Sequence, residues 1–109
     1  MHEKQLRHLA GKYKEQLTLE CKMKIGKIER VQVREIPDKG SLGVYGKCVT
    51  IPNSGTYEII LNSRFFDRGI AAIKRTLVHE ICHCAKTRFN HDRSFQNAYN
   101  KACMILGLQ

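Results

Sequence analysis

The sequence predicts a single α+β domain, with a helix at the N-terminus, a small, mainly antiparallel three-stranded sheet, and two helices in the last third. Apolar residues recur every three or four positions near the start, and short alternating segments separated by turn residues fill the middle. Helical spacing then returns after residue 67. The 109 residues, 42% of them hydrophobic, suffice for one modest core and are too few for two. We therefore expect residues 1–109 to form one domain.

The first predicted helix covers residues 2 to about 19. Its apolar positions are Leu6, Leu9, Ala10, Tyr13 and Leu17. This spacing is typical of an amphipathic helix that packs one face on a core and exposes a basic outer face.

Three strands are predicted in the middle of the chain. Residues 31–36 (VQVREI) alternate apolar and polar side chains before the turn sequence PDKG. Residues 42–51 form a second extended segment, in which Gly43 and Gly46 indicate a bulge or a close backbone approach. The turn sequence PNSG then leads into a third strand, residues 56–62 (TYEIILN).

A helix is predicted from residue 67 to about residue 86. At 100° per residue, one stripe faces the core and consists of Ile70, Ile73, Leu77, Ile81 and Cys84. His79 and His83 lie nearly opposite this stripe, close to the small residues Ala72 and Thr76. This arrangement is typical of a helix that crosses beneath a cleft.

The last predicted helix follows a break at RFN, residues 88–90. Asp92 precedes it and is a candidate N-cap. Its apolar positions are Phe95, Tyr99, Ala102, Cys103 and Leu106. We expect Tyr99 to pack in the core, although a tyrosine near the cleft could also donate a hydrogen bond to an oxyanion.

The sequence HEICH, residues 79–83, predicts a zinc site. Two histidines four residues apart on a helix can reach one zinc ion, and Glu80 is then held beside the metal as a general base for a zinc-activated water. Such a site needs a third protein ligand and one open coordination position. The alternative is an exposed helix with two solvated histidines. It does not explain why the histidines lie opposite the apolar stripe, beside the small residues Ala72 and Thr76.

The third ligand is sought downstream of the HEICH segment. No glutamate follows Glu80, and the choice narrows to His91 or Asp92. A glycine-containing HExxHxxGxxH spacing is absent, because Lys86 occupies the glycine position. We prefer His91, which supplies a neutral nitrogen and leaves Asp92 available as a cap or hydrogen-bond acceptor. The alternative is that His91 is a surface or capping histidine.

The segment HEICHCAKTRFNHDRSF resembles the SprT-like zinc metallopeptidase family, that is, Spartan-like catalytic domains. His91 and Phe95 match the family's His-Gly-x-x-Phe element, with Asp92 in place of the glycine. The segment YEIILNSRFF resembles the strand and the asparagine-bearing turn, here at Asn62, that lead into the family's active-site helix, and GVYGKC is similar to its glycine-cysteine strand. The likeness covers roughly residues 41–104.

This resemblance implies a minimal zincin-like α+β domain that acts as a zinc-dependent metalloendopeptidase. It implies one Zn²⁺ held by His79, His83 and His91, with Glu80 as general base, and a protein or peptide substrate, including DNA-associated or unfolded proteins. In zincin-like folds the strand before the active-site helix often pairs with extended substrate. Residues 56–61 are thus either such an edge or an ordinary strand.

The net charge of +9 predicts attraction to polyanions, so DNA is a possible partner through a basic surface. The alternative is that the lysines only keep the protein in solution. Basic residues that could border the cleft are Arg64, Arg68, Lys74, Arg75, Lys86, Arg88 and Arg93. A second function class follows from the charge, namely a non-catalytic nucleic-acid-binding module with a structural zinc closed by a fourth ligand such as Cys82.

Five cysteines and an N-terminal segment without an apolar stretch predict a reducing, cytoplasmic location. No apolar run approaches the roughly 18 residues that cross a bilayer, so we expect no membrane association. We also expect the protein to be a monomer. Cys82 and Cys84 are expected to be buried or partly buried thiols, and the remaining cysteines small core residues.

Overall fold

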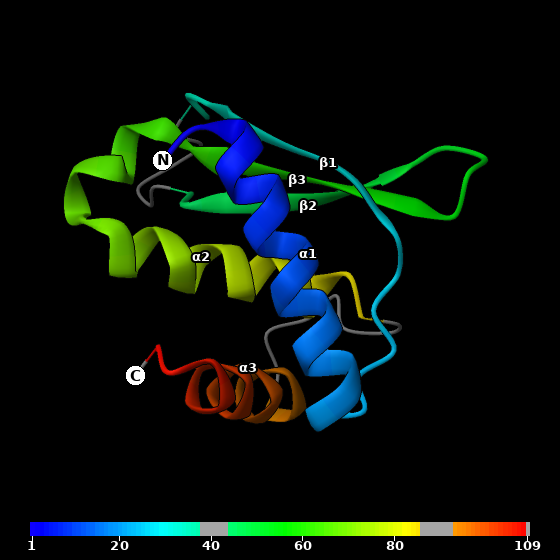
Figure 1. Ribbon diagram of the computed structural model, residues 1–109. Coiled ribbons are helices and arrows are strands. Elements are labelled where there is room, and N and C mark those ends of the chain that lie inside the picture. The colour runs from blue at the N-terminus through cyan, green and yellow to red at the C-terminus, as the bar shows by residue number, and fades with distance from the viewer. Residues whose placement is uncertain (38–43, 86–92, 109) are drawn as a thin grey trace.

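The computed structural model describes residues 1–37, 44–85 and 93–108. In chain order the elements are α1 (Glu3–Glu20), β1 (Ile28–Arg34), β2 (Gly46–Ile51), β3 (Thr56–Asn62), the 3₁₀ helix η1 (Ser63–Arg68), α2 (Ile70–His83) and α3 (Arg93–Leu106) (Figure 1). This order confirms the predicted α+β class. The residues His91 and Asp92, with the end of the predicted second helix and the break at 88–90, lie outside the described residues.

The three strands form a mixed sheet in the order β1-β3-β2. β2 is antiparallel to β3, with Cys48 opposite Ile59, whereas β1 is parallel to β3, with Val31 opposite the same Ile59. The prediction of a mainly antiparallel sheet was therefore wrong for one of the two pairings. β2, the next strand along the chain after β1, forms the opposite edge of the sheet. The hairpin then places β3 between β1 and β2, where it runs in the same direction as β1.

The β2–β3 hairpin closes through the predicted PNSG turn. Asn53 and Gly55 have φ angles of 62° and 70° there, a left-handed conformation that asparagine and glycine tolerate best. β3 has the predicted bounds and is buried along its last four residues. Because β3 is the central strand, the interpretation that it is an edge that pairs with substrate was wrong.

The bounds of the other two strands differ from those predicted. β1 begins and ends earlier, at Ile28 and Arg34. Ile36 is buried, but its backbone hydrogen-bonds the side chain of Asn62 rather than a strand. β2 begins at Gly46, and the predicted start at Leu42 lies outside the described residues.

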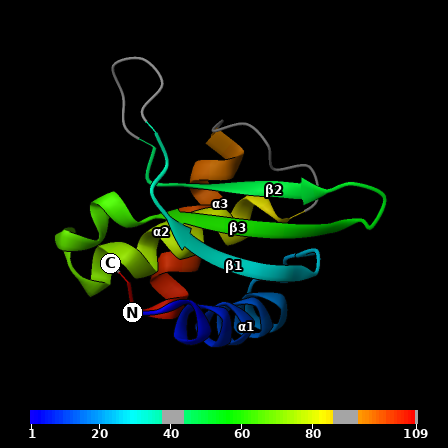
Figure 2. The ribbon, with the colours of Figure 1, turned by 90° about the horizontal axis from the view of Figure 1, so that it is seen from above.

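The helices gather on one face of the sheet (Figures 1 and 2). α1 contacts β1, α2 contacts β2 and β3, and α3 packs against α1 and α2. The predicted stripe of α1 is confirmed, since Leu6, Ala10, Tyr13 and Leu17 are buried. The side chain of His2 accepts a hydrogen bond from the backbone of Gln5 and caps this helix.

The core face of α2 is confirmed for Ile73, Leu77, Ile81 and Cys84, which are all buried. Ile70 was predicted on the same stripe but is 58% exposed. The helix begins at Ile70 rather than at residue 67, because residues 63–68 form η1 and Gly69 separates the two with a φ of 99°. The stripe is covered only from Ile73 onward. In the described part of the chain, no helix is long and apolar enough to cross a membrane.

Candidate metal centre

The two histidines of HEICH converge from successive turns of α2. Their Nε2 atoms lie 3.2 Å apart, and both side chains are partly exposed. Two nitrogen ligands at 2.0–2.1 Å from a tetrahedral zinc ion are about 3.3–3.4 Å from each other. The spacing of His79 and His83 therefore fits a pair of ligands to a single ion.

Helix α3 holds the two imidazoles in place. The ring of Phe95 stacks on His83 at 4.3 Å between centroids and meets His79 edge-on at 5.0 Å. Tyr99, one turn later, meets His79 at 5.4 Å. Aromatic contacts of this kind restrict the ring rotation of the histidines. Phe95 is fully buried, so it serves the core and the candidate site together.

The expectation that Tyr99 packs in the core is only partly confirmed. Tyr99 packs against the core, but it also lines the pocket beside His79. Burial raises the pKa of its phenol to about 12, so the hydroxyl keeps its proton at neutral pH. Helical periodicity assigned Tyr99 to the apolar stripe, and only the packing of α3 on α2 placed it next to the histidines.

The third predicted ligand, His91, belongs to the connection between α2 and α3 and lies outside the described residues. Within residues 1–37, 44–85 and 93–108, no group of three His, Cys, Asp or Glu side chains is arranged to hold a metal ion. The structure therefore brings His79 and His83 together, and the full ligand set of His79, His83 and His91 stays a prediction.

Glu80 lies next to His79 and is only 5% exposed. It lines the same pocket as His79, and burial raises the pKa of its carboxyl to about 8. A carboxylate removed from water binds a proton more tightly than an ordinary glutamate. Glu80 therefore lies in the pocket beside His79 with a carboxyl that holds its proton more tightly than an exposed glutamate does.

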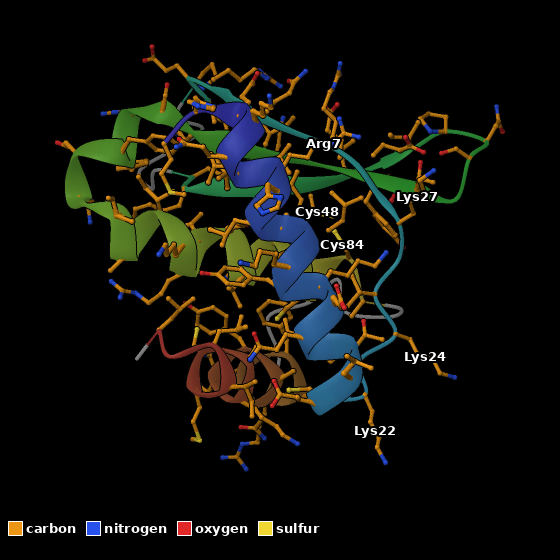
Figure 3. The ribbon with its side chains drawn as sticks, in the orientation of Figure 1. Arg7, Lys22, Lys24, Lys27, Cys48 and Cys84 are labelled. Atoms are coloured by element: carbon orange, nitrogen blue, oxygen red, sulfur yellow. The ribbon has the colours of Figure 1, made fainter. Side chains whose placement is uncertain are left out.

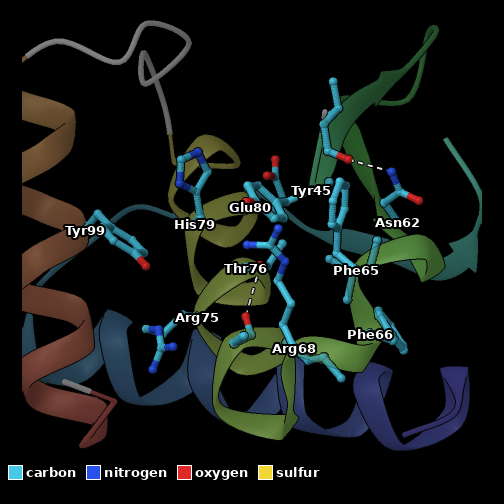
Figure 4. Close-up of a pocket in the computed structure, with 15 residues that line it drawn as sticks. Tyr45, Asn62, Phe65, Phe66, Arg68, Arg75, Thr76, His79, Glu80 and Tyr99 are labelled. Carbon is cyan, nitrogen blue, oxygen red and sulfur yellow. Dashed lines mark hydrogen bonds between the residues drawn. The ribbon is translucent and has the colours of Figure 1, made fainter. Parts of the chain in front are cut away.

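A cavity of about 460 Å³ opens beside α2 (Figure 4). Residues from five segments of the chain line it. These are Val44, Tyr45 and Gly46 at the entry to β2; Leu61 and Asn62 at the end of β3; Phe65, Phe66 and Arg68 of η1; Ala72, Ile73, Arg75, Thr76, His79 and Glu80 of α2; and Tyr99 of α3. The prediction that α2 crosses beneath a cleft is confirmed for Ala72, Thr76 and His79, whereas His83, predicted on the same side, does not line the cavity.

Asn62 fixes the wall of this pocket opposite α2. Its amide is 1% exposed, accepts hydrogen bonds from the backbone N–H groups of Ile36 and Arg64, and donates to the carbonyls of Ile36 and Val44. One side chain thereby joins the segment after β1, the entry to β2 and the start of η1. The sequence placed Asn62 at the end of a strand and, through the family resemblance, in a turn before the active-site helix, but it did not indicate these hydrogen bonds.

Gly46 lets β2 approach α2 closely. A Cβ atom at this position would lie 3.0 Å from the carbonyl oxygen of Ile60 and 3.3 Å from the methyl group of Thr76. The predicted close approach is therefore confirmed for Gly46, while Gly43 lies outside the described residues.

Two cysteines anchor the far end of α2 to the sheet (Figure 3). The Sγ atoms of Cys48 and Cys84 are 3.0 Å apart, and the Cys84 thiol also donates to the carbonyl of Glu80. The hydrogen bond with Cys48, together with burial, raises the pKa of Cys84. In addition, the backbone N–H of Gly26 donates to the Cys84 carbonyl at 2.9 Å. These contacts fix the turn of α2 that carries His83.

The predicted burial of Cys82 and Cys84 is confirmed, since both have no exposed surface. Cys82 belongs to the hydrophobic core and does not line the pocket. Of the basic residues expected at the cleft, Arg68 and Arg75 line it, while Arg64, Lys74 and Arg93 do not. Lys86 and Arg88 lie outside the described residues.

No protein-family model matches the chain, and no curated protein or solved structure matches it significantly. The similarity to SprT-like metallopeptidases thus depends on the residues of the HEICH segment and its flanking elements alone.

Proposed function

We propose that this protein is a zinc-dependent metallopeptidase of the SprT-like, zincin type that hydrolyses peptide bonds, with His79, His83 and His91 as metal ligands and Glu80 as general base. The observation that carries the proposal is the 3.2 Å separation of the Nε2 atoms of His79 and His83, combined with a pocket that His79 and the buried carboxyl of Glu80 line together. Neither an exposed pair of histidines nor an ordinary surface glutamate accounts for this combination.

A zinc ion at this site would supply Lewis acidity, which lowers the pKa of water and polarises the scissile carbonyl. The residues of the chain perform the remaining tasks. The carboxylate of Glu80 takes a proton from the attacking water and passes it to the amine that leaves. The ring of Tyr99 packs against His79 while its hydroxyl hydrogen-bonds Cys103, so Tyr99 helps to hold the imidazole in place.

The sheet supports an extended substrate in one particular place. β2 is an edge strand of the sheet, and its first residue, Gly46, lines the pocket together with the preceding residue, Tyr45. A peptide strand would therefore pair with β2 rather than with the central β3. Pairing through the backbone gives affinity with little dependence on side chains, which suits unfolded or DNA-associated protein substrates.

A second candidate is a non-catalytic nucleic-acid-binding module with a structural zinc. The net charge of +9 favours it, as do the exposed basic residues Arg7, Lys22, Lys24 and Lys27 along α1 and the connection to β1 (Figure 3). The fourth ligand that such a site needs was expected from Cys82, and the burial of that residue in the core does not support this role. We therefore rank this candidate second, and DNA, a cytoplasmic location and a monomeric state stay predictions.

The proposal is tested with three purified variants and the wild type. We expect one zinc ion per chain in the wild type and in Glu80→Gln, and loss of zinc in His83→Ala and His91→Ala, measured by elemental analysis after dialysis. Cleavage of a reduced, unfolded protein should fall by roughly 10² to 10⁴ in Glu80→Gln. Equal turnover in Glu80→Gln and the wild type would refute the mechanism. Assays with and without DNA separate the two candidates.

A further inference from the structure

An aromatic pair holds the guanidinium group of Arg68 in the pocket. The rings of Tyr45 and Phe65 are 4.5 Å apart, and the guanidinium carbon lies 5.2 Å from each centroid. A guanidinium that stacks on rings keeps its N–H edges available for a second partner, and its orientation is already restricted. Arg68 is therefore prepared to bind an anion.

A second guanidinium, that of the half-buried Arg75, lies along the same pocket near Tyr99 (Figure 4). Among the described residues, neither Arg68 nor Arg75 forms an ion pair with a carboxylate, and Glu80 is the one acidic side chain in the pocket lining. Two arginines without a carboxylate partner inside a concave wall attract an external anion.

The rest of the pocket is suited to a large apolar side chain. Tyr45 is 46% exposed, and aliphatic residues line the floor beside it, namely Val44, Leu61 and Ile73. A volume of about 460 Å³ lies within the range of small-ligand sites, roughly 300–1,000 Å³. The pocket therefore combines an apolar surface with the positive charges of two arginines, of which Arg68 is held by aromatic rings.

We propose that this pocket is a specificity site for peptide segments in which an aromatic or large aliphatic residue adjoins Asp or Glu. The apolar side chain packs against Tyr45 and Phe65, and the carboxylate pairs with Arg68, with Arg75 contributing charge. This inference rests on the proposed peptidase function, whose substrate class it names.

Single-stranded nucleic acid is the competing occupant, because aromatic rings and arginines also bind bases and phosphates. The peptide is favoured by the shape and lining of the pocket, because aliphatic residues beside Tyr45 make it an apolar hollow rather than an open stacking platform. A peptide brings one or two negative charges, which two arginines can match.

The test measures binding separately from cleavage. Three fluorescein-labelled peptides, identical except for Phe-Asp, Phe-Asn or Phe-Lys at the centre, are titrated into zinc-loaded Glu80→Gln protein and followed by fluorescence anisotropy. We expect the Phe-Asp peptide to bind about tenfold more tightly than the Phe-Lys peptide, because charge-assisted hydrogen bonds to Arg68 form only with the former. Equal affinities for the three peptides would overturn the inference.

Charge reversal provides the decisive variant. Arg68→Glu in the same background should invert the preference, so that Phe-Lys binds more tightly than Phe-Asp, a gain that misfolding cannot produce. Arg7→Glu is the matched control, because it makes the same change in charge at an exposed residue of α1 that does not line the pocket. If both variants shift the preference equally, the effect is general electrostatics and the pocket has no specific role.

Two further results separate the possible failures. Displacement of the Phe-Asp peptide by a short oligothymidylate at lower concentration than by unlabelled peptide would assign the pocket to nucleic acid and overturn the inference. An Arg68-dependent preference in binding, combined with no cleavage by the zinc-loaded wild type, would sustain the pocket while the proposed function fails. Cleavage without any such preference would do the reverse.

Discussion

Replacement of Asn62 by alanine tests whether one amide holds the pocket wall together. The substitution removes four hydrogen bonds, two of them with the buried backbone of Ile36, at 3.1 and 3.2 Å, and the others with Val44 and Arg64, at 2.6 and 3.1 Å. The two groups of Ile36 lose their side-chain partner in the interior, at about 1–3 kcal/mol each. The other two lie nearer to water, which can replace the lost partner at about 0.5 kcal/mol each.

The sum for Asn62→Ala is a loss of about 3–7 kcal/mol in the free energy of unfolding, a large share of the roughly 5–15 kcal/mol that holds a small domain together. Urea unfolding followed by circular dichroism measures it, with a chelator present so that metal binding does not add to stability. Asn97→Ala, at an exposed position of α3, is the control and should change stability by less than about 0.5 kcal/mol. A loss below about 1 kcal/mol for Asn62→Ala would show that the amide does not clamp the three segments.

Three further predictions follow from the packing around the candidate metal centre. Gly46→Val should lower stability by about 1–3 kcal/mol in urea unfolding, because its Cβ would meet the β3 backbone at 3.0 Å, and an unchanged midpoint would contradict the close approach. Phe95→Leu should keep the zinc stoichiometry but weaken zinc affinity about tenfold in a chelator competition, because the imidazoles lose the ring that orients them. Unchanged zinc affinity would show that the stacking does not orient the ligands. A mild thiol oxidant such as diamide should join Cys48 to Cys84 in a disulfide, mapped by peptide mass spectrometry, whereas a cross-link to Cys21 instead would contradict the 3.0 Å contact.

The elements that depend on local pattern agree with the sequence prediction. β3 has the predicted bounds, because a turn sequence precedes it and β-branched residues fill it. The buried stripes of α1 and most of α2 follow from spacing alone. The convergence of His79 and His83 was also predictable, since residues four apart always lie one turn apart on a helix.

The sequence by itself thus determined the α+β class, the core faces of the helices and the pair of imidazoles beside Glu80. Only the tertiary structure decided that β3 is central, that Phe95 and Tyr99 of α3 meet His79, and that the guanidinium of Arg68 lies over the rings of Tyr45 and Phe65. The physical reason is the range of the interactions. Periodicity reports which side of one element is apolar, whereas strand order and contacts between helices depend on pairings between segments that are distant in the chain.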